Sequence, residues 1–124
     1  MGKKIIELKN IYKKYGDFTA IDGINLYINE GEFLTLLGPS GCGKTTTLRI
    51  IGGFEQPDGG DILFDGVRIN DVPAHKRMLN TVFQKYALFT HLTVGQNIAF
   101  GPTIKKINPE QIQKDVKKYL NIVN

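Results

Sequence analysis

The sequence has little cysteine and no long apolar run. With one cysteine, no disulfide can form within the chain, which fits a reducing compartment. The apolar stretches are far shorter than the roughly 20 residues that a membrane-spanning helix needs. The start, Met1-Gly2-Lys3-Lys4, is basic, but the apolar segment after it is too short for a signal peptide. Repeats, low-complexity segments and runs of like charge are absent too, so we expect neither a membrane-spanning nor a disordered protein.

The bulk composition is that of a globular protein. The chain has 124 residues, of which 41% are hydrophobic and 23% charged, which is enough for one domain with a real core. The net charge is +4, and most of the excess lies in residues 101–124. A lysine-rich helix face is more often solvated than bound to nucleic acid. We therefore expect no nucleic-acid partner.

A phosphate-binding motif stands near the middle of the sequence. Residues 38–45 read Gly-Pro-Ser-Gly-Cys-Gly-Lys-Thr and fit the P-loop pattern G-x-x-x-x-G-K-[ST]. In a P-loop, backbone N–H groups point at phosphate oxygens, the lysine places a charge near the outer phosphates, and the last hydroxyl binds Mg²⁺. The candidate phosphate-binding residues are Gly38, Pro39, Ser40, Gly41, Cys42, Gly43, Lys44, Thr45 and Thr46.

Hydrophobic patterning around this motif predicts a mixed α/β protein. Asp65-Gly66 predicts a hairpin turn, and Asp22-Gly23 predicts a bulge. The strand before the P-loop is predicted to be buried, as is a short strand at 81–83. The predicted strands are 5–12, 19–28, 33–37, 61–64, 67–69 and 81–83. The predicted helices are 45–52, 92–100 and one that starts at 109.

The last predicted helix has a strong start and an apolar stripe. Asn108 suits the cap position and Pro109 the first turn. Apolar residues then recur at helical spacing, and we expect that the rest of the chain does not cover them. The stripe consists of Ile112, Val116, Tyr119, Leu120 and Val123.

Taken together, the motifs resemble the ATP-binding subunit of an ABC (ATP-binding cassette) transporter over all 124 residues. The loop 38–45 resembles the Walker A motif of import ATPases. Tyr15 resembles the A-loop aromatic that stacks on adenine, and Gln84 resembles the Q-loop glutamine that contacts Mg²⁺ and couples to membrane subunits. Residues 31–98 most resemble spermidine/putrescine importers. A flat aromatic at Tyr15 can stack on a purine, and Gln84, directly after the predicted buried strand, is expected at the carboxyl edge of the sheet, where ligands bind. The alternatives are an ordinary turn tyrosine and a surface amide.

The resemblance implies a P-loop NTPase fold, with a RecA-like core and an antiparallel β subdomain that enters a helical subdomain. It places the β subdomain and P-loop core at 1–84 and the start of the helical subdomain at 85–124. The implied cofactors are ATP and Mg²⁺, with Thr45 and Gln84 as metal ligands. The implied partners are transmembrane permease subunits and a second ATP-binding subunit. The implied location is cytoplasmic, peripheral on the inner face of the cell membrane.

Three features of the family are absent after Gln84: a Leu-Ser-Gly-Gly-Gln signature, a Walker B Asp-Glu and a switch histidine. That part of the chain has no serine, and its only aspartate and histidine, Asp115 and His91, stand in the wrong places. We therefore expect a truncated ATPase with no complete catalytic set. Lys44 would still stabilise phosphate and Gln84 would still serve as the Q-loop.

Two other interpretations remain open. A small P-loop kinase or GTPase needs an acidic metal ligand after a buried strand, and Asp61 and Asp65 only flank a strand-like run. A non-catalytic module could bind nucleotide or use the helical stripe to dock on a partner. The sequence leaves open whether the isolated chain is an enzyme.

Overall fold

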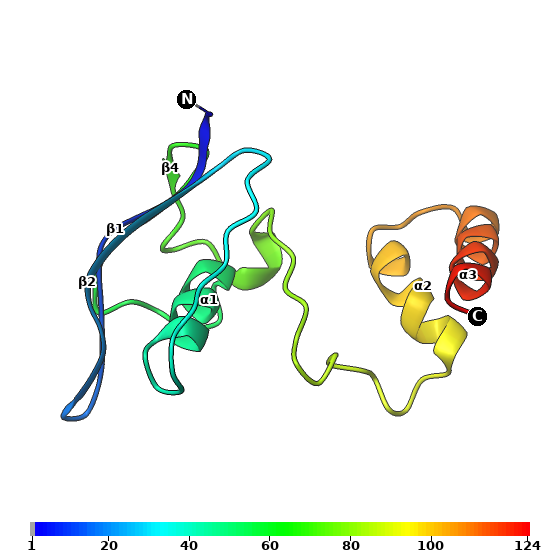
Figure 1. Ribbon diagram of the computed structural model, residues 1–124. Coiled ribbons are helices and arrows are strands. Elements are labelled where there is room, and N and C mark those ends of the chain that lie inside the picture. Colours follow the sequence, from blue (N-terminus) through cyan, green and yellow to red (C-terminus); the bar gives the residue numbers. More distant parts are fainter. Residues whose placement is uncertain (1) are drawn as a thin grey trace. The chain divides into compact units, whose positions relative to one another are not determined.

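The computed structural model describes residues 2–124, and the chain divides into two compact units, Met1–Thr81 and Val82–Asn124. Figure 1 shows a first unit built of a sheet with one α-helix, and a second unit built of helices. Among the described residues, no helix is both long enough and apolar enough to cross a membrane.

The sheet of the first unit is antiparallel throughout. Its strands are β1 (Lys4–Tyr15), β2 (Phe18–Asn29), β3 (Gly59–Phe64) and β4 (Val67–Arg68), in the spatial order β2-β1-β3-β4. The strand predictions near the N-terminus and at 61–64 are confirmed, with longer strands than expected. Asp65 and Gly66, with φ of 49° and 78°, form the tight turn between β3 and β4. Two residues with positive φ suit a hairpin, as their sequence predicted.

Two bulges put residues three apart in sequence onto the same buried face. Leu8 and Ile11 of β1 pair with Leu26 and Ile24 of β2, so two intervening residues of β1 face one of β2. The next register shift, after Ile11, skips Gly23 in β2, where φ is 70°. This confirms the bulge that the Asp-Gly sequence predicted. Without such shifts, the alternation of a strand would turn one residue of each pair to solvent.

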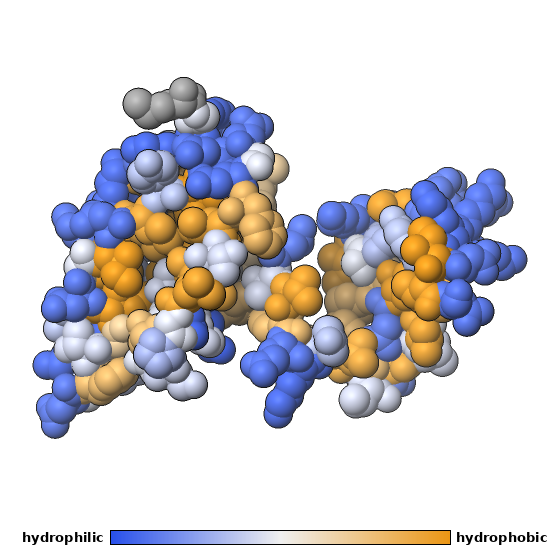
Figure 2. All heavy atoms as spheres, viewed as in Figure 1, coloured by the Kyte–Doolittle hydropathy of each residue, from blue (hydrophilic) through white to orange (hydrophobic). Residues whose placement is uncertain are grey.

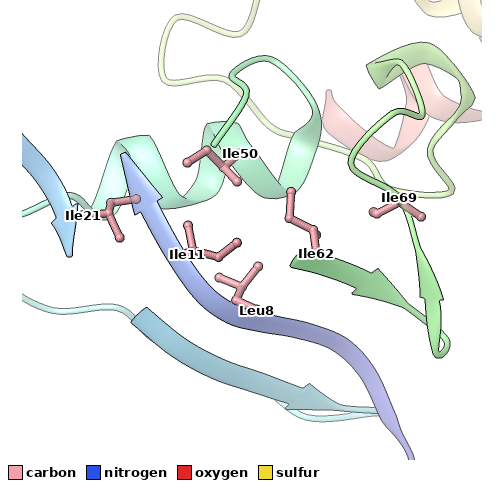
Figure 3. Close-up of a cluster of buried hydrophobic side chains, with 6 residues drawn as sticks. All are labelled: Leu8, Ile11, Ile21, Ile50, Ile62 and Ile69. Carbon is pink, nitrogen blue, oxygen red and sulfur yellow. The ribbon is translucent and has the colours of Figure 1, made fainter. Parts of the chain in front are cut away.

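The core of the first unit lies where α1 (Lys44–Gly52) packs on the sheet. The predicted helix 45–52 is thus confirmed to within one residue. Ile50 of α1 is fully buried among isoleucines and a leucine from the strands, as Figure 3 shows. The core residues are Leu8, Ile11, Ile21, Ile50, Ile62 and Ile69.

A buried arginine closes the far end of α1. The Arg77 side chain follows a short 3₁₀ turn, η1 (Ala74–Lys76), and only 7% of the residue is exposed. Its guanidinium donates hydrogen bonds to the carbonyl oxygens of Ile50 and Ile51, both at 2.8 Å, and to those of Ile69 and Val72 at 3.0 and 2.9 Å. These carbonyls include two at the C-terminus of α1, where helical carbonyls lack intrahelical partners and attract a cation.

Two predicted strands are wrong. Residues 33–37 form no strand, and Phe33 and Leu37 are 95% and 88% exposed rather than buried. Residues 81–83 also form no strand, and Val82 is 87% exposed. A strand requires a hydrogen-bonded neighbour, and in the described part of the chain the sheet assigns none to either segment. Figure 1 accordingly draws the cyan segment before α1 as a loop.

The second unit is a pair of helices, α2 (Val94–Ile104) and α3 (Pro109–Val123). Both predicted helices are confirmed, although α2 starts and ends later than expected. Thr93 and Gln96 form a reciprocal capping box at the start of α2. The Asn108 side chain accepts a hydrogen bond of 2.9 Å from the Glu110 N–H and caps α3, as predicted.

The apolar stripe of α3 is covered in part. Ile112 and Val116 are half-buried and line a groove of about 390 Å³ with residues of α2, among them Gly95. The expectation that nothing covers the stripe is therefore wrong for its first half. Tyr119 and Val123 remain 52% and 80% exposed, and Figure 2 shows apolar surface on this unit.

Replacing the buried arginine tests its role in holding α1. We expect Arg77→Met to lower the free energy of unfolding by about 3 kcal/mol, because a cluster of buried carbonyls loses its donors. Arg68→Met is the matched control, since Arg68 makes only exposed ion pairs with Asp61 and Asp71. Urea unfolding followed by circular dichroism measures both. Equal, small effects of the two substitutions would contradict the assigned role of Arg77.

Candidate functional site

The P-loop occupies the start of α1 in the first unit. The helix begins at Lys44 with Gly43 as its cap residue, and no side chain caps its first N–H groups. The first turn of α1 contains no acidic residue. The backbone donors and the positive end of the helix dipole are therefore available to an anion at this end.

Glycine is required at Gly43 for two separate reasons. Its φ is 91°, in the left-handed region, and a Cβ built there would lie 2.6 Å from the carbonyl oxygen of Ala20 in β2. The loop therefore passes directly against β2. Gly41 also has a positive φ, 81°, but a Cβ there would meet nothing within 4 Å. Of these two loop glycines, Gly43 combines a left-handed conformation with a backbone contact to β2.

The side chains of the loop divide into inward and outward groups. Thr47 is buried, and its hydroxyl donates to the Gly43 carbonyl oxygen at 2.7 Å, so it supports the cap. Thr45 is exposed on the first turn, beside Lys44. The Lys44 ammonium donates a hydrogen bond to the Gly38 carbonyl oxygen. This bond connects the first residue of α1 to the first residue of the P-loop.

A pocket of about 320 Å³ joins the P-loop to the turn between β1 and β2. It brings Tyr15 together with several of the predicted phosphate-binding residues, although their sequence positions are about 30 apart. Gly38, Pro39 and Cys42 belong to the loop but do not line this pocket. The lining residues are Tyr15, Phe18, Ala20, Ser40, Gly41, Gly43, Lys44, Thr45 and Thr46.

Sequence reasoning missed two members of this lining, Phe18 and Ala20. Phe18 pairs with Tyr15 across the Gly16-Asp17 turn, so the two aromatic side chains leave the same face of the hairpin. The two-residue turn was visible in the sequence, and hairpin pairing would have placed Phe18 opposite Tyr15. Phe18 is 56% exposed.

Gln84 lies apart from this group along the chain. It is an exposed residue in a turn of the second unit, and no strand precedes it. The sequence had placed it at the carboxyl edge of a buried strand. Its role as the Q-loop and as a metal ligand stays a prediction.

The pocket lining carries one sign of charge. Lys44 is its cation, and no carboxylate occurs among its residues. No group of three or more His, Cys, Asp or Glu side chains gathers anywhere in the described chain to hold a metal. The Thr45 hydroxyl is a suitable oxygen ligand for Mg²⁺, an ion that commonly takes few protein ligands and completes its shell with phosphates and water. The donor set therefore fits Mg²⁺ when a phosphate ligand accompanies it.

A buried lysine that is paired with two carboxylates lies beside Tyr15. Lys13 is 9% exposed, and its ammonium lies 3.0 Å from a Glu55 carboxylate oxygen and 3.6 Å from one of Asp58. The Glu55 carboxylate raises the pKa of Lys13, and the Lys13 ammonium lowers the pKa of Glu55. Both groups therefore stay charged at neutral pH.

A protein-family model described as ABC transporter matches residues 21–124. The chain belongs to the ABC transporter family. The spermidine/putrescine import ATP-binding protein PotA of Clostridium novyi is 56% identical over 124 residues, which is 100% of this chain and 36% of that protein. The PotA protein of Clostridium acetobutylicum is 58% identical over 97% of this chain and 34% of its own length. The chain thus spans about a third of these curated relatives.

Solved ABC transporter cassettes share the fold. A dimeric cassette in a post-hydrolysis state, bound to ADP and Pi, is 33% identical, with a TM-score of 0.79 over 94% of this chain and 56% of that one. A dimeric bacterial ABC transporter cassette is 35% identical, with a TM-score of 0.77 over 89% of this chain and 53% of its own. The P-loop NTPase fold expected from the sequence is confirmed as a partial domain with an antiparallel sheet and helices.

A pair of glycine substitutions tests the contact between the P-loop and β2. We expect Gly41→Ala to cost about 1 kcal/mol of stability, because only its positive φ is strained. Gly43→Ala should cost about 1–3 kcal/mol more, because the new methyl also meets the Ala20 carbonyl. Thermal unfolding of both variants gives the difference. Equal costs would show that β2 does not constrain the loop.

The Lys13–Glu55 ion pair predicts that the free energy of unfolding depends on pH. A carboxyl group whose pKa is lowered by folding stabilises the fold above its unfolded pKa and loses that effect as pH falls through its folded pKa. We therefore expect Glu55→Gln to be less stable than the parent at neutral pH, with a difference that shrinks once pH passes below 4.5, the ordinary value for Glu55. Urea unfolding across this range measures it. A difference that stays constant as pH falls below 4.5 would contradict the assignment.

Proposed function

We propose that the chain is the nucleotide-binding part of an ATP-binding subunit of an ABC-type importer, and that its ligand at this site is MgATP. The observation that carries the proposal is the single pocket in which an aromatic hairpin faces the P-loop. A flat ring suits a purine base, and the uncapped N–H groups at the start of α1, together with a lysine, suit phosphates. The PotA relatives support the assignment to polyamine import.

In this proposal, different residues bind the base, the phosphates and the metal ion of the nucleotide. Tyr15 stacks on the base, with Phe18 at its side. The backbone from Gly41 to Gly43 and the Lys44 ammonium hold the phosphates. The Thr45 hydroxyl would bind Mg²⁺, and that ion would draw charge from the phosphate oxygens when it is bound.

Binding without steady turnover is the expected behaviour of the isolated chain. Phosphoryl transfer to water needs a group that orients or deprotonates the water. No carboxylate or imidazole lines the described pocket. In a complete importer, the subunit would couple ATP binding and hydrolysis to transport, through permease subunits and a second ATP-binding subunit at the cytoplasmic face of the membrane.

Calorimetry with MgATP tests the proposal. We expect saturable binding by the parent chain and its loss in Lys44→Ala, because the outer phosphates lose their cation. Lys14→Ala is the matched control, since Lys14 is an exposed lysine outside the pocket lining. Equal binding by all three proteins, or none by the parent, would overturn the assignment.

A turnover assay separates binding from catalysis. We expect the chain to release no more phosphate from MgATP than Lys44→Ala does, because the pocket lacks a base. Steady phosphate release by the parent that Lys44→Ala abolishes would contradict the claim that the isolated chain only binds. A malachite-green phosphate assay over hours is sufficient.

A further inference from the structure

Lys13 carries a buried charge close to the ring of Tyr15, which lines the proposed nucleotide pocket. It stands two residues before Tyr15 on β1. A buried ammonium is stable only when it is paired, and the Glu55 and Asp58 carboxylates supply that pairing. The pair therefore fixes the position of the Lys13 side chain more firmly than an exposed ion pair would.

Tyr15 lies against the lysine of this pair. The Lys13 ammonium lies 5.1 Å from the centroid of the Tyr15 ring, within the range of a cation–π contact. The Tyr15 hydroxyl also contributes, after Lys13, to lowering the pKa of Glu55. The ring is nevertheless 45% exposed, so it keeps surface for a ligand on the pocket side.

The acidic partners come from the segment that follows the P-loop helix. Glu55 stands just after the end of α1, and Asp58 starts the approach to β3. The Asp58 N–H donates to the Tyr12 carbonyl oxygen at 2.8 Å, and its carboxylate accepts from the Lys14 N–H at 2.7 Å. These bonds tie the end of β1 to that segment on both sides of Lys13. The position of the Tyr15 ring is thus linked, through the segment that contains Glu55 and Asp58, to α1, the helix that carries the P-loop.

We propose that Lys13 and Glu55 are positioning residues that hold the Tyr15 ring as the platform for the nucleotide base. This inference rests on the proposed function, because it requires a nucleotide in the pocket. A ring already held in place loses less conformational entropy when a base stacks on it. The ion pair therefore contributes to affinity for the base and not to affinity for the phosphates.

The test compares two ligands that differ in the base. Calorimetry measures binding of MgATP and of magnesium tripolyphosphate, which offers phosphates only. The variants are Glu55→Gln, Lys13→Met and Tyr15→Ala. Asp61→Asn is the control, since it neutralises an exposed carboxylate that pairs with Arg68 and does not line the pocket.

We expect Glu55→Gln and Lys13→Met to bind MgATP roughly three- to tenfold more weakly, as loss of an ordered aromatic contact predicts. Their affinity for tripolyphosphate should equal that of the parent, and Asp61→Asn should match the parent for both ligands. Tyr15→Ala should lose at least as much for MgATP. Adding Glu55→Gln to Tyr15→Ala should then have no further effect, because the pair acts through the ring.

Each alternative outcome has a distinct meaning. If both ion-pair variants lose MgATP and tripolyphosphate affinity equally, the pair only supports the fold, and the positioning role is overturned. Unchanged MgATP affinity in both variants, with normal binding by the parent, overturns it as well. Failure of the parent to bind either ligand instead overturns the proposed nucleotide function itself.

Discussion

The first unit depends on one buried cation at the end of α1. The Arg77 guanidinium donates to the carbonyl oxygens of Ile50, Ile51, Ile69 and Val72. Burial lowers the pKa of Arg77, and hydrogen bonds to carbonyl dipoles offset part of the cost of removing the charge from water. Through these bonds, one side chain joins the C-terminus of α1 to the chain that follows β4. The helix that carries the P-loop is thereby fixed at the end opposite the phosphate site.

The other end of α1 is fixed by sterics rather than by charge. At Gly43, the backbone runs so close to the Ala20 carbonyl oxygen that no side chain fits. The Thr47 hydroxyl also donates a hydrogen bond to the carbonyl oxygen of Gly43, the cap residue. Because α1 is held at both ends, its first N–H groups keep a fixed direction towards the pocket. Preorganised donors of this kind bind an anion without a free-energy cost for ordering them. The apolar contacts of Ile50 with the strands also hold α1 against the sheet.

Local patterns predicted much of this arrangement, and long-range pairing explains the failures. The helix after the P-loop, the Asp65-Gly66 hairpin and the Asn108 cap each depend on a few neighbouring residues, and these three structural predictions hold. Residues 33–37 have the apolar composition of a buried strand, but a strand is defined by its neighbour, which a local pattern does not contain. The Lys13–Glu55 pair was missed for the same reason, because its members are about 40 residues apart and a lysine in a strand usually indicates solvent.

The chemistry of the pocket separates binding from hydrolysis. Binding an anion needs donors and positive charge, and the start of α1 and Lys44 provide both. Hydrolysis also needs a group that accepts a proton or orders a water molecule, and in the described pocket lining each polar side chain is either a hydroxyl, the Tyr15 phenol or the Lys44 ammonium. A serine or threonine hydroxyl is far too weak a base for that role at neutral pH unless another base activates it. The lining therefore accounts for binding a triphosphate, and hydrolysis would need a group that this lining does not supply.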